Sequence, residues 1–292
     1  MGGLIGIGLI LGMVFGGYTL AGGKMAIILH SLPFEMMMIG GAATGAFVVS
    51  NDFGTIKHTL HDIVKAFKGA HWKHSDYVDV LCLLLSLLKV ARTDPMALEA
   101  HIEQPQDSDL FKRYPRILAD EMAVDLITDT LRAATMNYDD PHQVDDSLSG
   151  ELDKRLVEAQ HSAHALQNMA DALPALGIVA AVLGVIKTMS SIDQPPEVLG
   201  QMIGGALVGT FLGVFLAYGF VGPLAARIKG INEEDHRFYT LISDVLVAHL
   251  HKHAPQSCVE VGRRNIPRKL RPTFNELEAA LKGKPMNAGA AA

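Results

Sequence analysis

The sequence predicts an all-α membrane protein with four transmembrane helices and a large helical cytoplasmic domain. Two observations predict this class: long apolar runs that almost lack charge, and amphipathic stretches at helical spacing outside those runs. The chain has 292 residues, of which 49% are hydrophobic, and a formal net charge of −6. This hydrophobic share is high for a soluble protein and modest for a pure transporter, so we expect both membrane and cytosolic mass.

The apolar runs divide the chain into four segments. The expected segments are transmembrane helices 1 and 2 in residues 1–50, a cytoplasmic helical domain in residues 51–170, transmembrane helices 3 and 4 in residues 171–226, and a cytoplasmic C-terminal helix and tail in residues 227–292. The first apolar run is no cleavable signal peptide, because it lacks a basic leading region and is too long.

The third and fourth spans form the clearest pair. The runs Ala172–Ile192 and Leu199–Ala226 contain only one charged residue, Lys187, and each is long enough to cross about 30 Å of hydrocarbon. Pro195 and Pro196 interrupt any helix in the polar turn between them. A helical hairpin is therefore predicted.

The first two spans also contain a single charged residue. Gly2–Gly22 carries no charge, and Leu32–Ser50 carries only Glu35, near its start. An unpaired charge in hydrocarbon costs at least about 2.5–3.5 kcal/mol, so an acidic group there would mark a proton or cation path. Because no Asp or Glu lies at the centre of any expected span, we expect such a carboxylate to come from another chain.

Basic residues close to the spans give the orientation. Lys57, Lys65 and Lys68 follow the second span, and Arg227 and Lys229 follow the fourth. By the positive-inside rule the long segments and both termini are cytoplasmic, and the two short hairpins are outside.

Small residues line the third and fourth spans. One stripe is Gly205, Gly209, Gly213 and Ala217, and the facing one is Pro174, Gly177, Ala181, Gly184 and Thr188. Thr210 is the one hydroxyl in the middle of the fourth span. Two interpretations stay open: close helix packing, with Thr210 bonded to its own i−4 carbonyl, or a narrow path in which Thr210 offers an oxygen to an ion or water.

Four helices are expected outside the membrane: Tyr77–Ala91, Arg116–Ala134, Glu151–Ala170 and Glu233–His253. The third should continue into the third span as one rod, which would link the cytosol to the membrane. Inside such rods, proline leaves the fourth preceding carbonyl unbonded, so Pro174 and Pro223 are expected bends.

The sequence contains no nucleotide-binding loop, no nucleophile elbow and no zinc spacing, so we expect no enzyme activity, no cofactor, no metal and no nucleic-acid partner. His249 and His253 could share a metal, but no third ligand is evident. Cys82 and Cys258 are expected to be reduced thiols. Arg92 and Glu99 are either an exposed pair worth less than about 1 kcal/mol or residues that face a partner protein.

Several motifs resemble one family. The segments LPALGIVAAVLGVI and LVGTFLGVFLAYGFVGPLA are similar to the third and fourth spans of the MotA family of flagellar motor stator subunits. DLFKRYPRILADEM, VFGGYTLAGG, VEVGRR and RPTFNELE resemble the same family, in the right order and over nearly the whole chain.

The resemblance implies a proton-driven motor in the bacterial inner membrane. A pentamer of this chain would surround two single-span MotB-like chains, each supplying the proton-binding aspartate, and would push on the rotor protein FliG. The implied roles are Thr210 in the ion path, Pro174 and Pro223 in conformational coupling, and Arg92 and Glu99 at the rotor. The spacing of the last two departs from the family pattern by one residue, and Pro95 falls between them.

Ala181 indicates the coupling ion. Sodium-driven relatives such as PomA have Thr at this position, and Ala removes an oxygen that a desolvated sodium ion would need. Proton coupling is therefore predicted. The alternative in the same class is an ExbB- or TolQ-type energiser of outer-membrane processes, whose members usually have three spans. A membrane-bound enzyme and a non-conducting scaffold are the alternatives in other classes.

Overall fold

The computed structural model describes residues 2–135 and 140–282, and within these residues it contains helices and no strands. The prediction of an all-α chain is confirmed. The chain divides into two compact units. The first unit comprises Met1–Gly69 and Glu158–Ile231, and the second comprises Ala70–Val157 and Asn232–Ala292.

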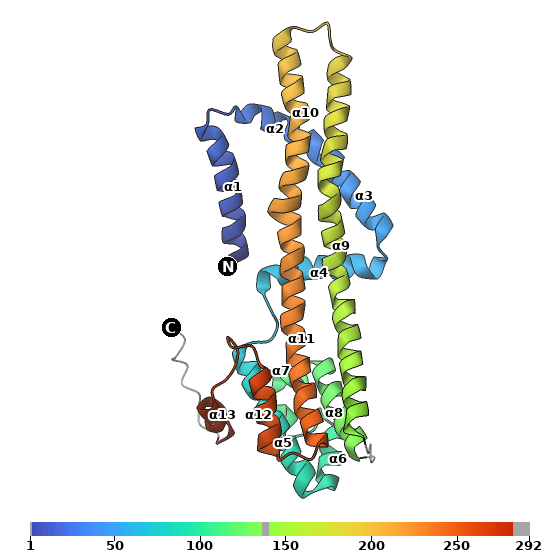
Figure 1. Cartoon of the computed structure of the whole chain (residues 1–292), viewed down its shortest axis with the longest axis vertical. Coiled ribbons are helices and arrows are strands. Elements are labelled where there is room, and N and C mark those ends of the chain that lie inside the picture. The colour runs from blue at the N-terminus through green and yellow to red at the C-terminus, as the bar shows by residue number, and fades with distance from the viewer. Residues whose placement is uncertain (1, 136–139, 283–292) are drawn as a thin grey trace. The chain divides into compact units, whose positions relative to one another are not determined.

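Four helical stretches of the described residues are long and apolar enough to cross a membrane, which confirms the predicted number (Figure 1). The first is α1 (Gly2–Leu20), and the second joins α2 (Met25–Glu35), the π-helical turn η1 (Met36–Gly40) and α3 (Gly41–Ser50). The third lies within α9 (Pro141–Met189). The fourth lies within the continuous run of α10 (Pro196–Leu216), the π-helical turn η3 (Ala217–Val221) and α11 (Gly222–Leu250).

The second span begins earlier than predicted, and this corrects the placement of Glu35. We expected a start at Leu32, with Glu35 close to the start of the span. The helix begins at Met25 instead, because the residues ahead of Leu32 carry no charge and Pro33 is accommodated inside the helix. Glu35 is the last of the 11 residues of α2 in a span of 26 residues. The expectation that no acidic residue lies near the centre of a span is therefore wrong.

The third and fourth spans pack backbone against backbone. A Cβ atom placed on Gly177 would stand 2.8 Å from the carbonyl oxygen of Gly209, and one placed on Gly213 would stand 2.6 Å from the carbonyl oxygen of Leu173. Side chains at these positions would force the helices apart, so glycine permits the approach. The interpretation of the small-residue stripes as close helix packing is confirmed.

Two spans contain a π-helical turn near a proline. η1 follows Pro33, and η3 comes directly before Gly222 and Pro223. The N–H of Gly222 donates to the carbonyl of Ala217, five residues earlier, where an α-helix would use the fourth. Such turns are common where helices bend and at functional sites. α9, in contrast, stays α-helical through Pro174.

α4 (Phe53–Lys68) follows the second span in the first unit and is amphipathic. Asp52 caps it by accepting hydrogen bonds from the backbone N–H groups of Gly54 and Thr55. Its inner face buries Ala66, which packs in a small core with Leu166 of α9 and with side chains of α11. Its opposite face is exposed.

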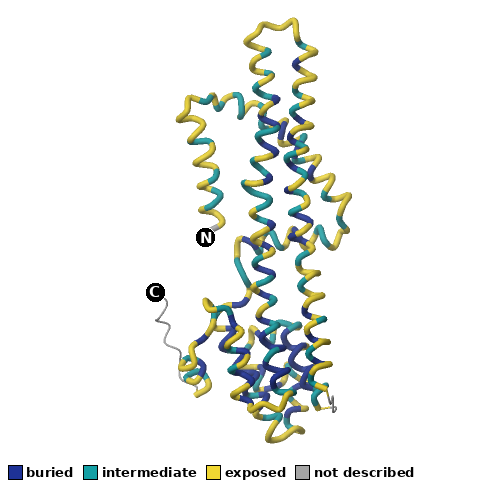
Figure 2. The backbone as a smooth tube through the Cα atoms, in the orientation of Figure 1, coloured by how far each residue is buried: buried dark blue, intermediate teal, exposed yellow. Residues whose placement is uncertain are grey.

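The second unit is built around α5 (His74–Thr93), most of whose apolar side chains are buried (Figure 2). The helices around it are α6 (Pro95–Glu103), η2 (Phe111–Arg113), α7 (Pro115–Leu118), α8 (Glu121–Thr135), α12 (Pro255–Asn265) and α13 (Phe274–Leu281). The indole of Trp72 stacks on Phe238 with ring centroids 3.8 Å apart, which joins the two chain segments of the unit. Cys82 and Cys258 are buried free thiols, as predicted.

The remaining helix predictions are partly confirmed. α9 runs unbroken over 49 residues, so the rod expected from Glu151 into the third span is correct. The helix expected from Arg116 to Ala134 is interrupted, because Asp120 accepts a hydrogen bond from the N–H of Ala123 and starts a new helix, α8. The helix expected from Glu233 is a direct continuation of the fourth span in α11.

Candidate ion pathway

Ala181 and Thr210 lie at one level of the hairpin that α9 and α10 form. At this level Ala180 meets Gly209, since a Cβ atom on Gly209 would stand 3.2 Å from the Cβ of Ala180. Ala181 and Thr210 are the next residues of the two helices, and both are partly exposed while Ala180 and Gly209 are buried. The structure therefore places both predicted ion-path residues beside the same contact in the packed seam.

The hydroxyl of Thr210 forms no hydrogen bond within the described part of the chain. One expectation was a bond to the carbonyl of Ala206, four residues earlier, as threonines in helices often make. Thr188 on the facing helix makes that kind of bond, donating to the carbonyl of Gly184 at 2.9 Å. The Thr210 oxygen, in contrast, keeps its full capacity to bind a water or an ion.

Glu35 adds a buried carboxylate at the same level. Its side chain is 5% exposed, and Oε2 has no hydrogen-bond partner among the residues that the structure describes. A Cβ atom on Gly209 would stand 2.6 Å from this oxygen, so the missing side chain of Gly209 makes room for the carboxylate. Sequence reasoning missed Glu35 because it started the span too late. The uncharged residues from Met25 onward could have shown that the second span begins before Leu32.

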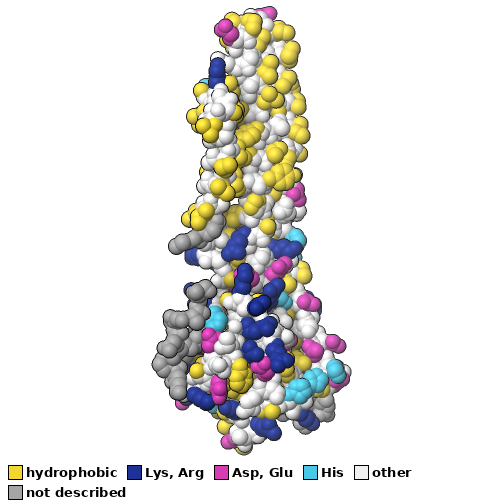
Figure 3. Space-filling model, turned by 60° about the vertical axis from the view of Figure 1, so that its left-hand side comes forward, with side chains coloured by type: hydrophobic (Ala, Val, Ile, Leu, Met, Phe, Trp, Pro, Cys, Tyr) yellow, Lys and Arg dark blue, Asp and Glu magenta, His cyan; other side chains and the backbone are white. Residues whose placement is uncertain are grey.

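A cavity of about 480 Å³ lies beside Glu35 in the first unit. Its polar lining consists of His30, Ser31, Glu35, Lys187 and Gln201. Lys187 and Gln201 lie near the turn between α9 and α10, so the cavity leads from the polar end of the hairpin toward the buried carboxylate. Groups of both charge signs line this route. On the face of the spans that Figure 3 shows, hydrophobic side chains are common and charged ones are few.

Pro174 and Pro223 lie in the first unit, in the parts of α9 and α11 away from the hairpin turn. Each lacks an N–H, which leaves the carbonyls of Ala170 and Gly219 without their usual donors. Pro174 is two turns from Ala181 on the same helix, and Pro223 directly follows η3 and Gly222. The two prolines are therefore joined by continuous helix to the level of Thr210.

Arg92 and Glu99 lie on different helices of the second unit. α5 ends at Thr93, and Asp94 caps α6 by accepting a hydrogen bond from the N–H of Met96. Arg92 and Glu99 are both exposed and form no ion pair with each other within the described residues. Met96, between them in sequence, is 81% exposed. Met and Arg are enriched at protein interfaces, so this corner fits a contact surface better than an internal ion pair.

Comparison with known proteins identifies the family. The profile "Motility protein A N-terminal" matches residues 4–95, and "MotA/TolQ/ExbB proton channel family" matches residues 118–239. Motility protein A of Salmonella typhimurium is 39% identical over 276 residues, which is 94% of this chain and 93% of the relative. The chain belongs to the motility protein A family. Chemotaxis protein LafT of Vibrio parahaemolyticus is 34% identical over 94% of this chain and 96% of its own.

Solved structures share the fold of this motility protein A family member. C. jejuni MotAB matches with a TM-score of 0.72 and 17% identity, over 93% of this chain and 98% of that chain. The flagellar MotAB stator complex from Bacillus subtilis matches with a TM-score of 0.72 and 22% identity, over 94% and 100%. The helical fold is thus shared over nearly its whole length.

The matches favour motility protein A over the ExbB- or TolQ-type alternative. The second profile is common to all three groups, but the first is named for motility protein A alone and covers the first two spans. The relatives from Salmonella typhimurium and Vibrio parahaemolyticus match along almost the whole chain. The resemblance to the MotA family is therefore confirmed.

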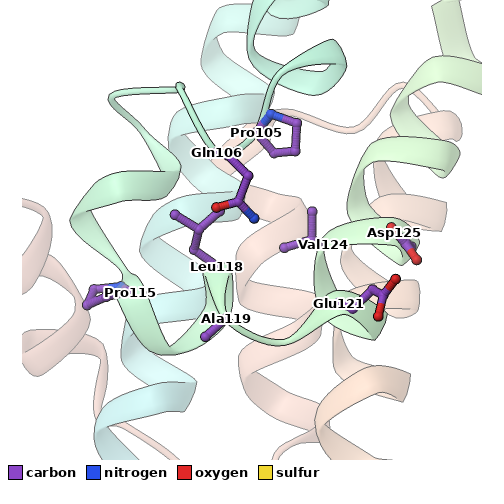
Figure 4. Close-up of a pocket in the computed structure, with 8 residues that line it drawn as sticks. All are labelled: Pro105, Gln106, Pro115, Leu118, Ala119, Glu121, Val124 and Asp125. Carbon is purple, nitrogen blue, oxygen red and sulfur yellow. The ribbon is translucent and has the colours of Figure 1, made fainter.

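A shallow hollow of about 530 Å³ in the second unit is lined by none of the residues that the sequence analysis predicted for a functional site (Figure 4). Leu118 and Val124 contribute its apolar wall, and Glu121 and Asp125 lie together at one side on α8.

His249 and His253 also lie in the second unit. Within residues 2–135 and 140–282 no group of three or more His, Cys, Asp or Glu side chains is placed to hold a metal ion. The Nδ1 atom of His249 is buried without a partner in this part of the chain. Burial lowers the pKa of His249, so the neutral imidazole is favoured.

Proposed function

We propose that this chain is a stator subunit of a flagellar motor and that, with a MotB-like single-span partner, it conducts protons and converts their flow into torque. One observation carries the proposal: in a chain related over 94% of its length to motility protein A, the free hydroxyl of Thr210 lies level with Ala181 in the membrane hairpin. The chain would be a multi-pass protein of the bacterial inner membrane with both termini in the cytoplasm.

The partner would supply the aspartate that takes up and releases each proton. Protonation removes the charge of that aspartate and weakens the hydrogen bond that its carboxylate accepts from the Thr210 hydroxyl. Each proton that crosses 100 mV releases about 2.3 kcal/mol, which is enough to bias a helix movement. The cavity beside Glu35 offers a polar route from the outer end of the hairpin to this level.

Several copies of the chain would surround the partner, and a pentamer is the state we propose. In support, Gly8, Gly12 and Gly16 form a stripe on α1, and a Cβ atom on any of them would meet nothing within 4 Å. A stripe of small residues that faces open space offers a neighbouring helix a close approach.

Movement would reach the rotor protein FliG through the two continuous helices. α9 and α11 each run from a span into the second unit without a loop that could absorb a rotation. Pro174 and Pro223 would supply the bends. The exposed corner of Arg92, Met96 and Glu99 would contact the rotor.

The test is proton flux through vesicles that contain this chain and its partner, with Thr210→Val compared with Thr188→Val. Thr210→Val should lower the flux by roughly tenfold, because it removes a free oxygen worth about 1–2 kcal/mol to a desolvated proton carrier. Thr188→Val removes a hydroxyl that is already bonded within its helix and should leave the flux close to normal. Equal flux in both variants would show that Thr210 is only a packing residue.

A further inference from the structure

A cleft of about 640 Å³ opens in the first unit between α1, the end of α4, and the segment of η3 and α11 around Pro223. Its α1 wall consists of Gly3, Gly6, Ile7 and Ile10, which share one helix face. At one end Ile10 closes the cleft, because a Cβ atom on Gly219 would stand 3.4 Å from the Cγ2 atom of Ile10. At Gly6 the space is open, since a Cβ atom there would meet nothing within 4 Å.

The opposite end of the cleft carries two positive charges. Lys68 is the last residue of α4, and the guanidinium of Arg227 lies next to it, with Nη2 3.8 Å from the position of a Cβ atom on Gly69. Both side chains line the cleft and are exposed. Neither forms an ion pair or a side-chain hydrogen bond with the described residues. The cleft is thus apolar along its length and cationic at its mouth.

The surface of α4 next to the cleft also has the residue pattern of a helix that lies at a membrane boundary. Phe53, Leu60, Val64 and Phe67 lie on one face of the helix and are 88%, 63%, 53% and 46% exposed. Lys57 and Lys68 flank this face. An amphipathic helix with exposed apolar residues and flanking lysines lies in the plane of the interface, with its apolar face among the acyl chains. Phe67 belongs both to that face and to the cleft wall.

We propose that this cleft binds one anionic phospholipid, with its phosphate held by Lys68 and Arg227 and one acyl chain lying along Gly3, Gly6 and Ile7. The occupant must be apolar along its length and negative at one end, where the spans meet their basic flanks, and a membrane phospholipid has that form. A second copy of this chain does not fit as well, because its α1 carries no acidic residue to meet the two cations. The inference goes beyond the proposed function and requires only that the four helices cross a membrane.

The bound lipid would lie against the helix segment that bends. Pro223 and Leu224 form part of the cleft wall, together with Phe220 of η3. A phosphate held by Arg227 is one turn from Pro223 on α11, so the headgroup and the bend would share one short segment.

The experiment uses the full chain assembled with its partner subunit, placed in bilayers of phosphatidylcholine with a minor share of a photoreactive phosphatidylglycerol. Crosslinking should fall on α1 and on η3. A basic residue near the surface contributes about fivefold to the binding of an anionic lipid, so the double variant Lys68→Gln/Arg227→Gln should lose roughly thirtyfold. The matched control is Lys24→Gln/Lys229→Gln, which removes two exposed cations of the same unit that do not line the cleft and should keep its crosslinks.

A second variant tests the apolar part without changing charge. Gly6→Leu places a large side chain in the open cleft and should abolish crosslinking. Gly17→Leu, near the other end of α1, should not, because Gly17 does not line the cleft and a Cβ atom there would meet nothing within 4 Å. Retention of phosphatidylglycerol by both cleft variants would overturn the proposal. Equal capture of a photoreactive phosphatidylcholine, or crosslinks from the cleft to a second copy of the chain, would overturn it as well. Since lipid capture is measured without proton flux, these outcomes are independent of whether the chain drives a motor.

Discussion

At the scale of single residues, Glu35 and Thr210 share a property that is uncommon in a packed span: each has a polar oxygen without a partner in the described chain. Polar atoms buried away from water are normally bonded, because an unbonded one costs free energy. Both oxygens lie at the level where Gly209 meets Ala180. The cost applies to the buried Oε2 atom of Glu35, whereas Thr210 is partly exposed, and we propose that protons or water reach this level of the hairpin.

We predict that Glu35→Gln lowers proton flux severalfold while the complex still assembles. The amide keeps the size of the side chain but cannot accept and release a proton, so a route that uses the carboxylate would slow. The measurement is flux through vesicles with the partner present, and Glu197→Gln, an exposed acid at the start of α10, is the control. Flux equal to that of the unchanged protein would assign Glu35 to packing alone.

The sequence could predict some of these residues and not others. Thr210 is visible as the one hydroxyl in the middle of an apolar run, and Ala181 through the family resemblance. Glu35 was misplaced, because the predicted span began at Leu32 and left out the uncharged residues from Met25 onward, which belong to the same helix. The Thr188 hydroxyl is bonded and the Thr210 hydroxyl is not. This difference depends on side-chain rotamers that packing sets, and sequence spacing does not specify them.

At the scale of elements, the hairpin of α9 and α10 was the most predictable part of the fold. A stripe of glycine and alanine every fourth residue has few structural uses besides close packing, and the structure places Gly177 against Gly209 and Gly213. The π-helical turns η1 and η3 could not be predicted, since a bond to the fifth residue leaves no trace in hydropathy. The break at Asp120 depends on one cap that competes with a continuous helical pattern.

We predict that Gly177→Ala destabilises the hairpin by about 1–3 kcal/mol, because its Cβ would press on the backbone of Gly209 and Gly213. Gly200→Ala on α10 is the matched control. A Cβ there meets nothing within 4 Å, so the variant should be about 0.5–1 kcal/mol more stable through helix propensity. Thermal unfolding of the two purified variants checks this. Equal stability would mean that the helices are less closely packed than the glycine contacts require.

We predict that Arg92→Glu abolishes most torque while the protein still inserts and assembles. Arg92 is exposed at the end of α5 and bonds no acidic side chain in the described residues, so its reversal should not unfold the second unit. Swimming speed and membrane content are measured together. Lys269→Glu, an exposed cation elsewhere in the same unit, should leave swimming unchanged. Normal swimming of Arg92→Glu would remove this residue from the rotor surface.

At the scale of the whole molecule, the side chain at position 181 bears on which ion drives the motor. Ala181 offers no side-chain oxygen, so a desolvated sodium ion would lack a ligand there. We predict that swimming speed follows the proton-motive force and does not change when external sodium is replaced by potassium. Speed that rises with sodium at constant proton-motive force would contradict this prediction. Ala181→Thr is a second test of the same prediction, because it adds the side-chain oxygen that a sodium ion would lack at this position.

The division of the chain into two units has a consequence for biogenesis. The second unit is assembled from Ala70–Val157 and Asn232–Ala292, and the hairpin lies between them in the sequence. Trp72 cannot stack on Phe238 until the ribosome has synthesised both. The core around α5 can thus be completed only after the whole hairpin has been synthesised, so any delay in translating the hairpin also delays the folding of the second unit.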